Sequence, residues 1–277
     1  MSLFITSLNS GSNGNCYYVG NNNEAILVDA GISCRELEKR MARLGLSLLK
    51  VKALFISHEH SDHIKGVEVL AKKYKLPVYI TDATLSAGSL KLDKSLVRPF
   101  KAYQQVIVGE LSVIAFPKLH DAADPYSFVV EFKKIKIGVF TDIGSSCEHV
   151  IANFKQCHAV FLEANYDEKM LEEGSYPFYL KSRIRSEKGH LSNNQALELF
   201  IKHKPEFMSH LLLSHLSKDN NCPELVLDLF SKHADKTNII IATRYKETAV
   251  YQIKNISNHL LQTPGKFEIE PLQMSLF

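Results

Sequence analysis

Apolar residues along this chain fall into short runs separated by turns rich in Gly, Asn, Ser and Pro, and this pattern predicts many β-strands. The expected strands cover residues 3–8, 16–19, 25–28, 51–56, 77–80, 111–116, 128–132, 136–140, 159–162, 208–213, 238–242 and 248–253. Apolar residues at helical spacing predict helices over residues 33–44, 64–74, 81–87, 147–155, 192–202 and 223–233. Strands that alternate with helices in two successive groups predict an α/β fold, an αββα sandwich of two facing mixed β-sheets with helices outside.

One motif, Ser57-His58-Glu59-His60-Ser61-Asp62-His63, lies between an expected buried strand and an expected helix. Its imidazoles and carboxylate are ligands that suit a divalent ion such as Zn, Mn or Fe. In an extended loop alternate side chains point the same way, so His58 and His60 can reach one metal ion while Asp62 and His63 reach a second. The alternative is a His-rich surface loop, which the recurrence of such ligands further along the chain makes the weaker interpretation.

The length, charge and cysteine content of the chain limit which kinds of protein fit this interpretation. The 277 residues, 45% of them hydrophobic, are ample for one domain with a sizeable core, and we expect a catalytic domain over residues 1–253 followed by a tail over 254–277. A net charge of +3 is too small by itself to indicate nucleic-acid binding. The five cysteines never form a C-x-x-C pair, and no apolar run is long enough to cross a membrane, so we expect a cytoplasmic protein with reduced thiols.

Two further segments could contact a substrate. The turn over residues 10–15 is rich in Gly, Ser and Asn, and its Ser12, Asn13 and Asn15 could bind phosphate, although a plain β-turn explains it equally well. Residues 176–190 interleave aromatic side chains with cations, which suits a phosphate backbone and exposed bases. An amphipathic helix with a solvated face is the alternative. The expected substrate-binding cations are Arg183, Arg185 and Lys188.

The spacing of His58, His60, Asp62 and His63 resembles the HxHxDH signature of the metallo-β-lactamase superfamily. Within it the chain is most similar to the YycJ/WalJ group, through S-G-S-x-G-N at 10–15, H-D-A at 120–122, G-H-L-S-N at 189–193 and S-H-L-S at 214–217. The resemblance implies a metal-dependent DNA exonuclease that acts from a 5′ end and is connected with mismatch repair. The chain also resembles tRNA 3′-processing endonucleases, and it has no room for the inserted β-CASP domain of other nucleases.

The resemblance implies a site with two divalent metal ions and a hydroxide between them that attacks phosphorus. The implied metal ligands are His58, His60, Asp62, His63, His120, Asp142 and His215, with Asp142 as the bridging carboxylate. Asp29 is expected to brace the metal loop. The expected catalytic residues are Asp62, His190 and Glu163; His190 would protonate the leaving oxygen and Glu163 would orient it.

The last residues form a separate motif. Gln273, Met274, Leu276 and Phe277 are similar to the Q-L-[S/D]-L-F peptide that binds the bacterial β sliding clamp, with Met274 in place of Leu. An apolar tail that packs on its own domain is the alternative. We therefore expect DNA as the partner, with RNA as the alternative, and the clamp as a candidate partner of the tail. The other function classes are an RNA-processing nuclease, a hydrolase of small phosphodiesters or thioesters, and a catalytically silent binding module.

Overall fold

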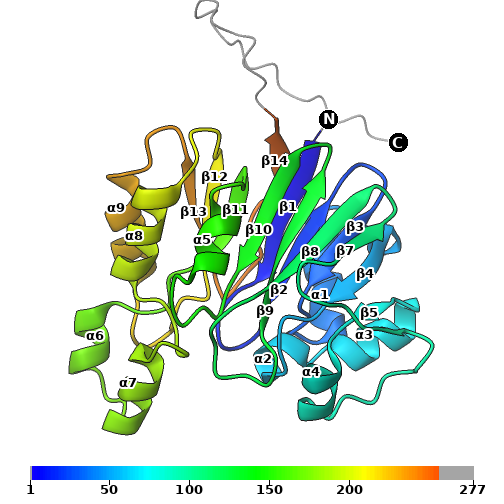
Figure 1. Ribbon diagram of the computed structural model, residues 1–277, viewed down its shortest axis with the longest axis horizontal. Helices are drawn as coiled ribbons and strands as arrows, with labels where there is room; N and C mark the ends of the chain where they lie inside the picture. The colour runs from blue at the N-terminus through cyan, green and yellow to red at the C-terminus, as the bar shows by residue number, and fades with distance from the viewer. Residues whose placement is uncertain (1, 256–277) are drawn as a thin grey trace, which may run out of the picture.

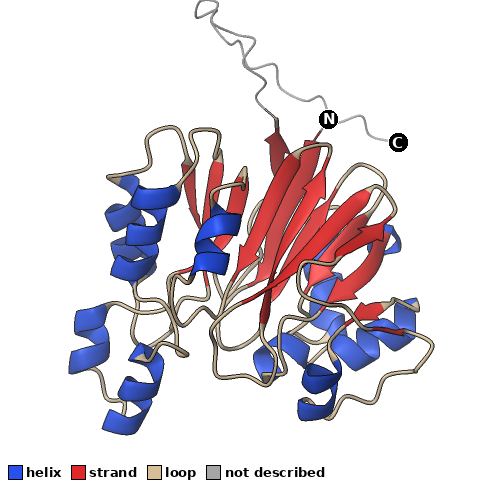
Figure 2. Cartoon of the chain, viewed as in Figure 1, coloured by secondary structure: helices blue, strands red, loops and turns tan. Residues whose placement is uncertain are grey.

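The computed structural model describes residues 2–255 (Figure 1). Two seven-stranded sheets face each other, and Figure 2 shows the helices on the outside of the pair. The first sheet has the strand order β14 (Tyr251–Lys254), β1 (Ser2–Asn9), β2 (Cys16–Gly20), β3 (Ala25–Val28), β4 (Val51–Phe55), β5 (Val78–Tyr79) and β6 (Val97–Arg98). The second has the order β13 (Asn238–Ile241), β12 (His210–Ser214), β11 (Ala159–Glu163), β10 (Ile135–Phe140), β9 (Tyr126–Phe132), β8 (Leu111–Pro117) and β7 (Gln105–Val108).

Helices cover the outer faces of both sheets. Near the first sheet lie α1 (Cys34–Arg43), the 3-10 turn η1 (Leu48–Lys50), α2 (Ser61–Ile64), α3 (Val67–Tyr74) and α4 (Asp82–Ala87). Near the second lie α5 (Glu148–Phe154), α6 (Glu168–Glu173), α7 (Phe178–Arg185), α8 (Asn193–His203) and α9 (Pro223–Ser231). Each sheet is antiparallel in one part and parallel in the other, so the predicted αββα sandwich of mixed sheets is confirmed. None of the helices within residues 2–255 has the length and apolar character needed to span a bilayer.

The alternation of side chains along each strand divides the core into three layers. Phe55 on β4 points between the sheets, where it packs against Phe128 of β9 with ring centroids 5.6 Å apart. Its neighbour Leu54 points the other way, into the layer beneath α1 and α3. A third layer lies between the second sheet and α5, α8 and α9, and includes Phe154 and Phe230. Both faces of these strands are therefore buried, as is typical of sheets covered by helices.

Three local expectations from the sequence need correction. The helix expected over residues 64–74 is interrupted, because the Gly66 amide donates to Ala30 O at 2.7 Å and so leaves the helical ladder between α2 and α3. The strands β6 and β7 and the helix α6 were not expected; they have two, four and six residues, too few for a clear apolar period. The strand expected to begin at residue 248 begins at Tyr251 and ends at Lys254, one residue beyond the expected domain boundary.

The topology brings the polar motifs to one edge of the sandwich. Parallel strands run in the same direction, so the loops after their carboxyl ends lie at the same edge. Asp29 follows β3 and the 57–63 loop follows β4, while Asp142 follows β10, Glu163 ends β11 and His215 follows β12. Segments far apart in the sequence thereby meet at the lower edge of the molecule in Figure 1.

Candidate metal centre

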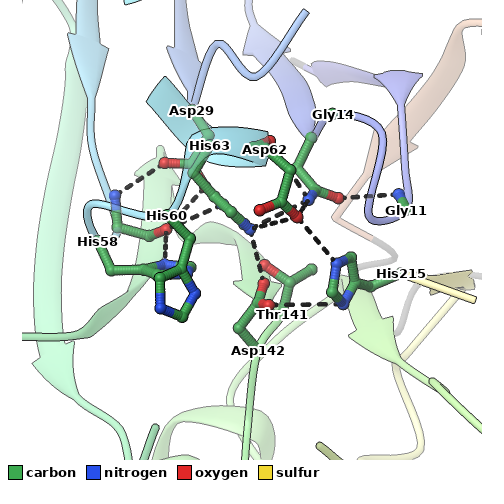
Figure 3. Close-up of polar contacts among 12 residues, drawn as sticks. Gly11, Gly14, Asp29, His58, His60, Asp62, His63, Thr141, Asp142 and His215 are labelled. Carbon is green, nitrogen blue, oxygen red and sulfur yellow. Dashed lines mark hydrogen bonds and ion pairs between the residues drawn. The ribbon is translucent and has the colours of Figure 1, made fainter. Parts of the chain in front are cut away.

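The metal-binding motif is held by Asp29. Its Oδ1 accepts the Ser57 amide at 2.8 Å and its Oδ2 accepts the Ser57 hydroxyl at 2.8 Å. The same Oδ2 lies 2.7 Å from Nδ1 of His63, which turns the Nε2 of that ring toward the centre of the site. Asp29 therefore occupies the bracing position expected from the sequence (Figure 3).

The loop packs too closely against the β3–α1 turn for any side chain to intervene. A Cβ added at Gly31 would lie 1.6 Å from the carbonyl oxygen of Asp62. That oxygen accepts the backbone amide of Asn15 at 2.7 Å. The side-chain Nδ2 of Asn15 lies 3.1 Å from Asp62 Oδ2 and 3.0 Å from His63 Nε2. Asn15 is fully buried, so it orients these two side chains; as placed, it is not open to the substrate contact expected from the sequence.

Three imidazoles converge on one point. Nδ1 of His60 lies 3.1 Å from Nε2 of His58 and 3.3 Å from Nε2 of His120. The outer nitrogen of His58 is 2.9 Å from the Ser57 hydroxyl, and that of His120 is 3.0 Å from the Gly189 carbonyl, so their inner nitrogens are free to act as ligands. A tetrahedral zinc site with Zn–N bonds of about 2.0–2.1 Å has nitrogens about 3.3 Å apart. The spacing of these nitrogens fits such a site.

A second group adjoins the first. The ligand atoms of Asp62, His63 and His215 lie within 4.8 Å of one another, and so do those of His58, His63 and Asp142. Nε2 of His215 lies 3.4 Å from Asp62 Oδ2. Figure 3 shows His63 between the two groups, with Asp62 and His215 on one side and His58 and His60 on the other.

Asp142 lies where the two groups meet. Its Oδ2 is 3.0 Å from His63 Nε2, and its Oδ1 is 3.5 Å from His215 Nδ1 and 3.8 Å from His120 Nε2. The carboxylate is buried, and its Oδ2 makes no hydrogen bond of acceptable geometry within the described residues. A buried carboxylate oxygen without a donor is costly. Nitrogen and oxygen donors surround this carboxylate oxygen. Such a set of donors fits a divalent cation.

Three residues of this site have strained backbones. Asp29, Asp142 and His215 all have left-handed backbones, with φ of 60°, 54° and 55°. Such conformations cost about 1–3 kcal/mol each and cluster at functional sites. Hydrogen bonds hold two of these turns: the His215 amide donates to Ser10 Oγ at 2.7 Å, and Nζ of the buried Lys118 donates at 2.7 Å to the Thr141 carbonyl that precedes Asp142.

The charges of the site control its protonation. Burial alone would lower the pKa of His63, but Asp142 and Asp29 raise it to about 10. Burial lowers the pKa of His120 to about 3 and that of His58 well below its usual value. Burial would raise the pKa of Asp142, yet His215 and His63 hold it well below its usual range. His58 and His120 are therefore poised as neutral imidazoles, whereas His63 is a cation among carboxylates.

The Glu163 and His190 side chains form a pair beside Asp142. Glu163 is fully buried at the end of β11, and its Oε1 lies 2.6 Å from His190 Nδ1 and 3.2 Å from His215 Nδ1. Its Oε2 accepts the amide of Ile143 at 2.6 Å. Burial would raise the pKa of Glu163, but His190 lowers it, so this carboxylate stays ionised. The sequence-based pairing of Glu163 with His190 agrees with this geometry.

A pocket of about 360 Å³ opens onto the site. It is lined by Ser12, His60, Ser61, Asp62, Asp142, Asn165, Tyr176, Leu180, Arg183, Ile184, His190, His215 and Ser217. The Nε of Arg183 pairs with Asp121, the residue after His120. Arg185 pairs with Glu172 and lines a separate hollow between α6 and α7.

The remaining expected substrate contacts are dispersed. Ser12 is exposed and lies on the pocket wall, whereas Nδ2 of Asn13 donates to the Arg244 carbonyl at 3.1 Å. Lys188 is exposed on the loop after α7. The expected clamp peptide, with Gln273, Met274, Leu276 and Phe277, lies outside the described residues.

Several supporting residues were not predicted from the sequence. Asn165 donates through Nδ2 to the His215 carbonyl at 2.8 Å, Lys118 supports the turn at Asp142, and Asp121 holds Arg183 at the pocket. All three lie within two residues of a predicted site residue in the sequence, which was the available signal. Nothing in the sequence shows that the Lys118 ammonium turns inward.

The comparisons with known proteins agree with this geometry. Residues 10–143 match the Metallo-beta-lactamase superfamily. Exodeoxyribonuclease YycJ of Bacillus anthracis is 36% identical over 230 residues, which cover 81% of this chain and 86% of that protein. Exodeoxyribonuclease WalJ of Streptococcus pneumoniae is 35% identical over 225 residues, covering 79% of this chain and 83% of that protein.

A solved structure shows the same fold. The metallo-beta-lactamase fold protein YhfI from Bacillus subtilis superposes with a TM-score of 0.70 over 91% of this chain and 100% of that one, at 16% identity. The fold and the histidine-aspartate cluster therefore define a metal-dependent hydrolase of the metallo-β-lactamase superfamily. Within it, the chain belongs to the family of the YycJ and WalJ exodeoxyribonucleases.

Proposed function

We propose that this protein is a metal-dependent 5′-to-3′ DNA exonuclease that serves DNA mismatch repair. The observation that carries the proposal is the Glu163–His190 pair beside the donor cluster, because it adds a proton donor to a site able to hold two cations. The names of the relatives, exodeoxyribonucleases over most of both chains, support DNA as the substrate. The 5′ polarity and the link to repair rest on resemblance to that group.

Each ligand residue of the cluster would hold one of two cations or lie between them. One divalent ion, Zn, Mn or Fe, would be held by His58, His60 and His120, and a second by Asp62, His63 and His215, with Asp142 shared between them. When bound, such ions lower the pKa of water and neutralise the phosphate oxygens on which charge develops. Asp29 and Asn15 keep these ligands in position through the contacts described above.

His190 would donate the proton that hydrolysis requires. Water adds its oxygen to phosphorus, the bond from phosphorus to the leaving oxygen breaks, and that oxygen must be protonated. Nδ1 of His190 donates to Glu163, so its Nε2 is left to face the pocket that His190 lines. Glu163 is ionised and buried, and it holds the His190 ring in this orientation. The His190 proton passes to the leaving oxygen, and the proton released by the attacking water restores the pair.

The direct test uses single strands of identical sequence made as DNA and as RNA, labelled at either the 5′ or the 3′ end and incubated with the protein and Mn or Zn. We expect early release of a labelled mononucleotide from 5′-labelled DNA only. Release from RNA alone would replace DNA with RNA as the substrate. Degradation of neither polymer, together with turnover of a small phosphodiester or thioester, would overturn the nuclease proposal.

We also propose that residues 1–253 form the catalytic domain and that the tail, residues 254–277, binds the β sliding clamp through Gln273, Met274, Leu276 and Phe277. The support is the sequence pattern. The amide of Gln273 and the apolar pair Leu276 and Phe277 match a peptide that binds in a groove of its partner. Titration calorimetry with purified clamp tests it. Gln273→Ala and Phe277→Ala should each weaken binding at least tenfold, while Ser275→Ala should not. Equal binding by all variants would contradict the assignment.

A further inference from the structure

The helix α7 forms one wall of the pocket. Leu180, Arg183 and Ile184 of this helix line it, together with Tyr176 from the loop before. Figure 1 shows α7 and α6 below the sheets, at the same end as α2, whose residues include Asp62 and His63. A polymer that enters the pocket would therefore contact α7.

Two large aromatic side chains on α7 are strongly exposed. Phe178 is 83% exposed and Tyr179 is 74% exposed. At about 100° per residue, Tyr179 lies about 40° around the helix from Arg183, whereas Phe178 lies about 140° from it. Tyr179 thus lies beside Arg183 on a flank of α7 that adjoins the pocket wall, although it is not itself one of the lining residues, and Phe178 lies on the side of the helix that carries Arg185. The two adjacent aromatic residues are placed differently with respect to the site.

The chemistry of the Tyr179 edge indicates its occupant. An exposed aromatic ring provides a flat surface on which a base can stack, and Arg183, one helical turn away, provides a cation for a phosphate. The Nε of Arg183 is engaged by Asp121, which fixes the guanidinium at the pocket and leaves its terminal Nη donors to reach an anion. Bases inside a duplex are stacked on both faces, whereas an unpaired base can turn its face to Tyr179.

We propose that Tyr179 and Arg183 form a single-strand binding edge, on which Tyr179 stacks against an unpaired base while Arg183 contacts a backbone phosphate of the strand entering the pocket. The identity of the strand as DNA rests on the proposed function. The edge makes the enzyme prefer a frayed or single-stranded end over a fully paired one. The edge adjoins the pocket and carries the cation Arg183. Both features favour a nucleic-acid strand over a protein as the occupant.

The test compares a base-bearing DNA single strand with strands in which one of the nucleotides near the 5′ end is abasic. Binding is measured by fluorescence anisotropy of a 3′-labelled strand, in a His190→Ala background so that the strand stays intact. Tyr179→Leu removes the ring, Tyr179→Phe keeps it, and Phe178→Leu is the matched control on the far side of the helix. Steady-state cleavage by the same variants without the His190 change gives KM and kcat separately.

We expect Tyr179→Leu to weaken binding of the base-bearing strand by about 5- to 100-fold, with KM rising and kcat nearly unchanged. This variant should also lose the preference for base-bearing over abasic strands, while Tyr179→Phe and Phe178→Leu keep it. An undiminished preference in Tyr179→Leu, or an equal loss in Phe178→Leu, would overturn the inference. If the native protein cleaves DNA but Tyr179 has no effect, the binding edge alone fails; if the native protein neither binds nor cleaves DNA, the proposed function fails with it.

Discussion

Oε1 of Glu163 lies 2.6 Å from Nδ1 of His190, and the carboxylate is fully buried while the imidazole reaches the pocket. A buried anion that accepts the proton of one imidazole nitrogen fixes the tautomer and the orientation of the ring. His63 has a similar partner in Asp29, and His215 also lies 3.2 Å from Glu163, but His190 stands apart because it is not one of the predicted metal ligands. In the proposed function the two kinds of histidine have different chemical tasks: the predicted ligands hold cations, and His190 moves a proton.

Removing the imidazole of His190 should therefore impair chemistry without emptying the site. We expect His190→Ala to lower kcat by about 10²- to 10⁴-fold, the usual contribution of a proton donor. Metal content, measured by mass spectrometry, should equal that of the native protein. Glu163→Gln keeps the shape but removes the charge, and should lower kcat less than His190→Ala does. An unchanged kcat in His190→Ala would show that the proton comes from elsewhere.

Metal binding should depend on pH differently at the two groups. A metal ligand must be a neutral imidazole. The pKa of His120 is about 3 and that of His58 is also depressed, so neither ring carries a proton to release near neutral pH. The pKa of His63 is about 10. Burial would lower the pKa of His215, in the same group, but Asp142 raises it well above its usual value. An ion at this group must therefore displace protons, and its affinity should rise at least tenfold per pH unit in the range where these rings are protonated.

Calorimetric titration of the metal-free protein in buffers of different ionisation enthalpy measures this proton release. We expect one ion to bind with no protons released from His58 or His120, and the other to release at least one. The same proton release for both ions, or affinities that do not change with pH, would contradict the assignment of His63 as a protonated ligand.

The close approach of Gly31 to the metal loop gives a structural prediction. Gly31→Ala places a Cβ 1.6 Å from the Asp62 carbonyl oxygen, so the loop must move. We expect a loss of several kcal/mol in the free energy of unfolding and loss of the metal ion at the Asp62 group. Gly45 has open space around it and a φ of 67°, so Gly45→Ala should cost only about 1 kcal/mol and keep both ions. Denaturant unfolding measures the loss of stability, and metal analysis measures the bound ions. Equal stability and equal metal content in the two variants would contradict the prediction.

The two arginines of α7 should contribute differently to nucleic-acid binding. Arg183 lines the pocket, while Arg185 lies in another hollow with Glu172. Neutralising one phosphate contact to single-stranded DNA reduces the slope of log affinity against log salt by about 0.7. We expect that reduction for Arg183→Ala and an unchanged slope for Arg185→Ala. Equal slopes for both variants would show that Arg183 does not contact the backbone.

Much of the fold was predictable because its signal is local. Strands such as Val51–Phe55 are apolar runs bounded by turns, and helices such as Asn193–His203 carry a capping box at Ser192 and Gln195. The two-residue strands β5 and β6 depend instead on their neighbours, since Val78 pairs with both Leu54 and Val97. Pairing between distant segments has no local signature in so short a stretch, and β6 was accordingly missed.

The candidate site was predictable to the extent that its residues occur in motifs. His58 to His63 form one motif, and Asp142 and His215 follow strands that the sequence reveals. The role of Asn15 was not predictable, because a Gly- and Asn-rich turn fits an anion site equally well; only its burial against Asp62 and His63 separates the two. The Asp121–Arg183 pair joins residues 62 positions apart, and no sequence pattern links them.

The central claim is that the cluster and the Glu163–His190 pair together cleave DNA from its 5′ end. The most direct measurement is a digest of linear DNA labelled at one or the other end, with Mn or Zn, by the native protein, Asp142→Ala and His190→Ala. The account predicts early release of the 5′ label as a mononucleotide by the native protein. It predicts that Asp142→Ala is inactive with reduced metal content, and that His190→Ala keeps full metal content but releases the label about 10²- to 10⁴-fold more slowly. Release that begins at the 3′ end, or persists in both variants, would contradict the account.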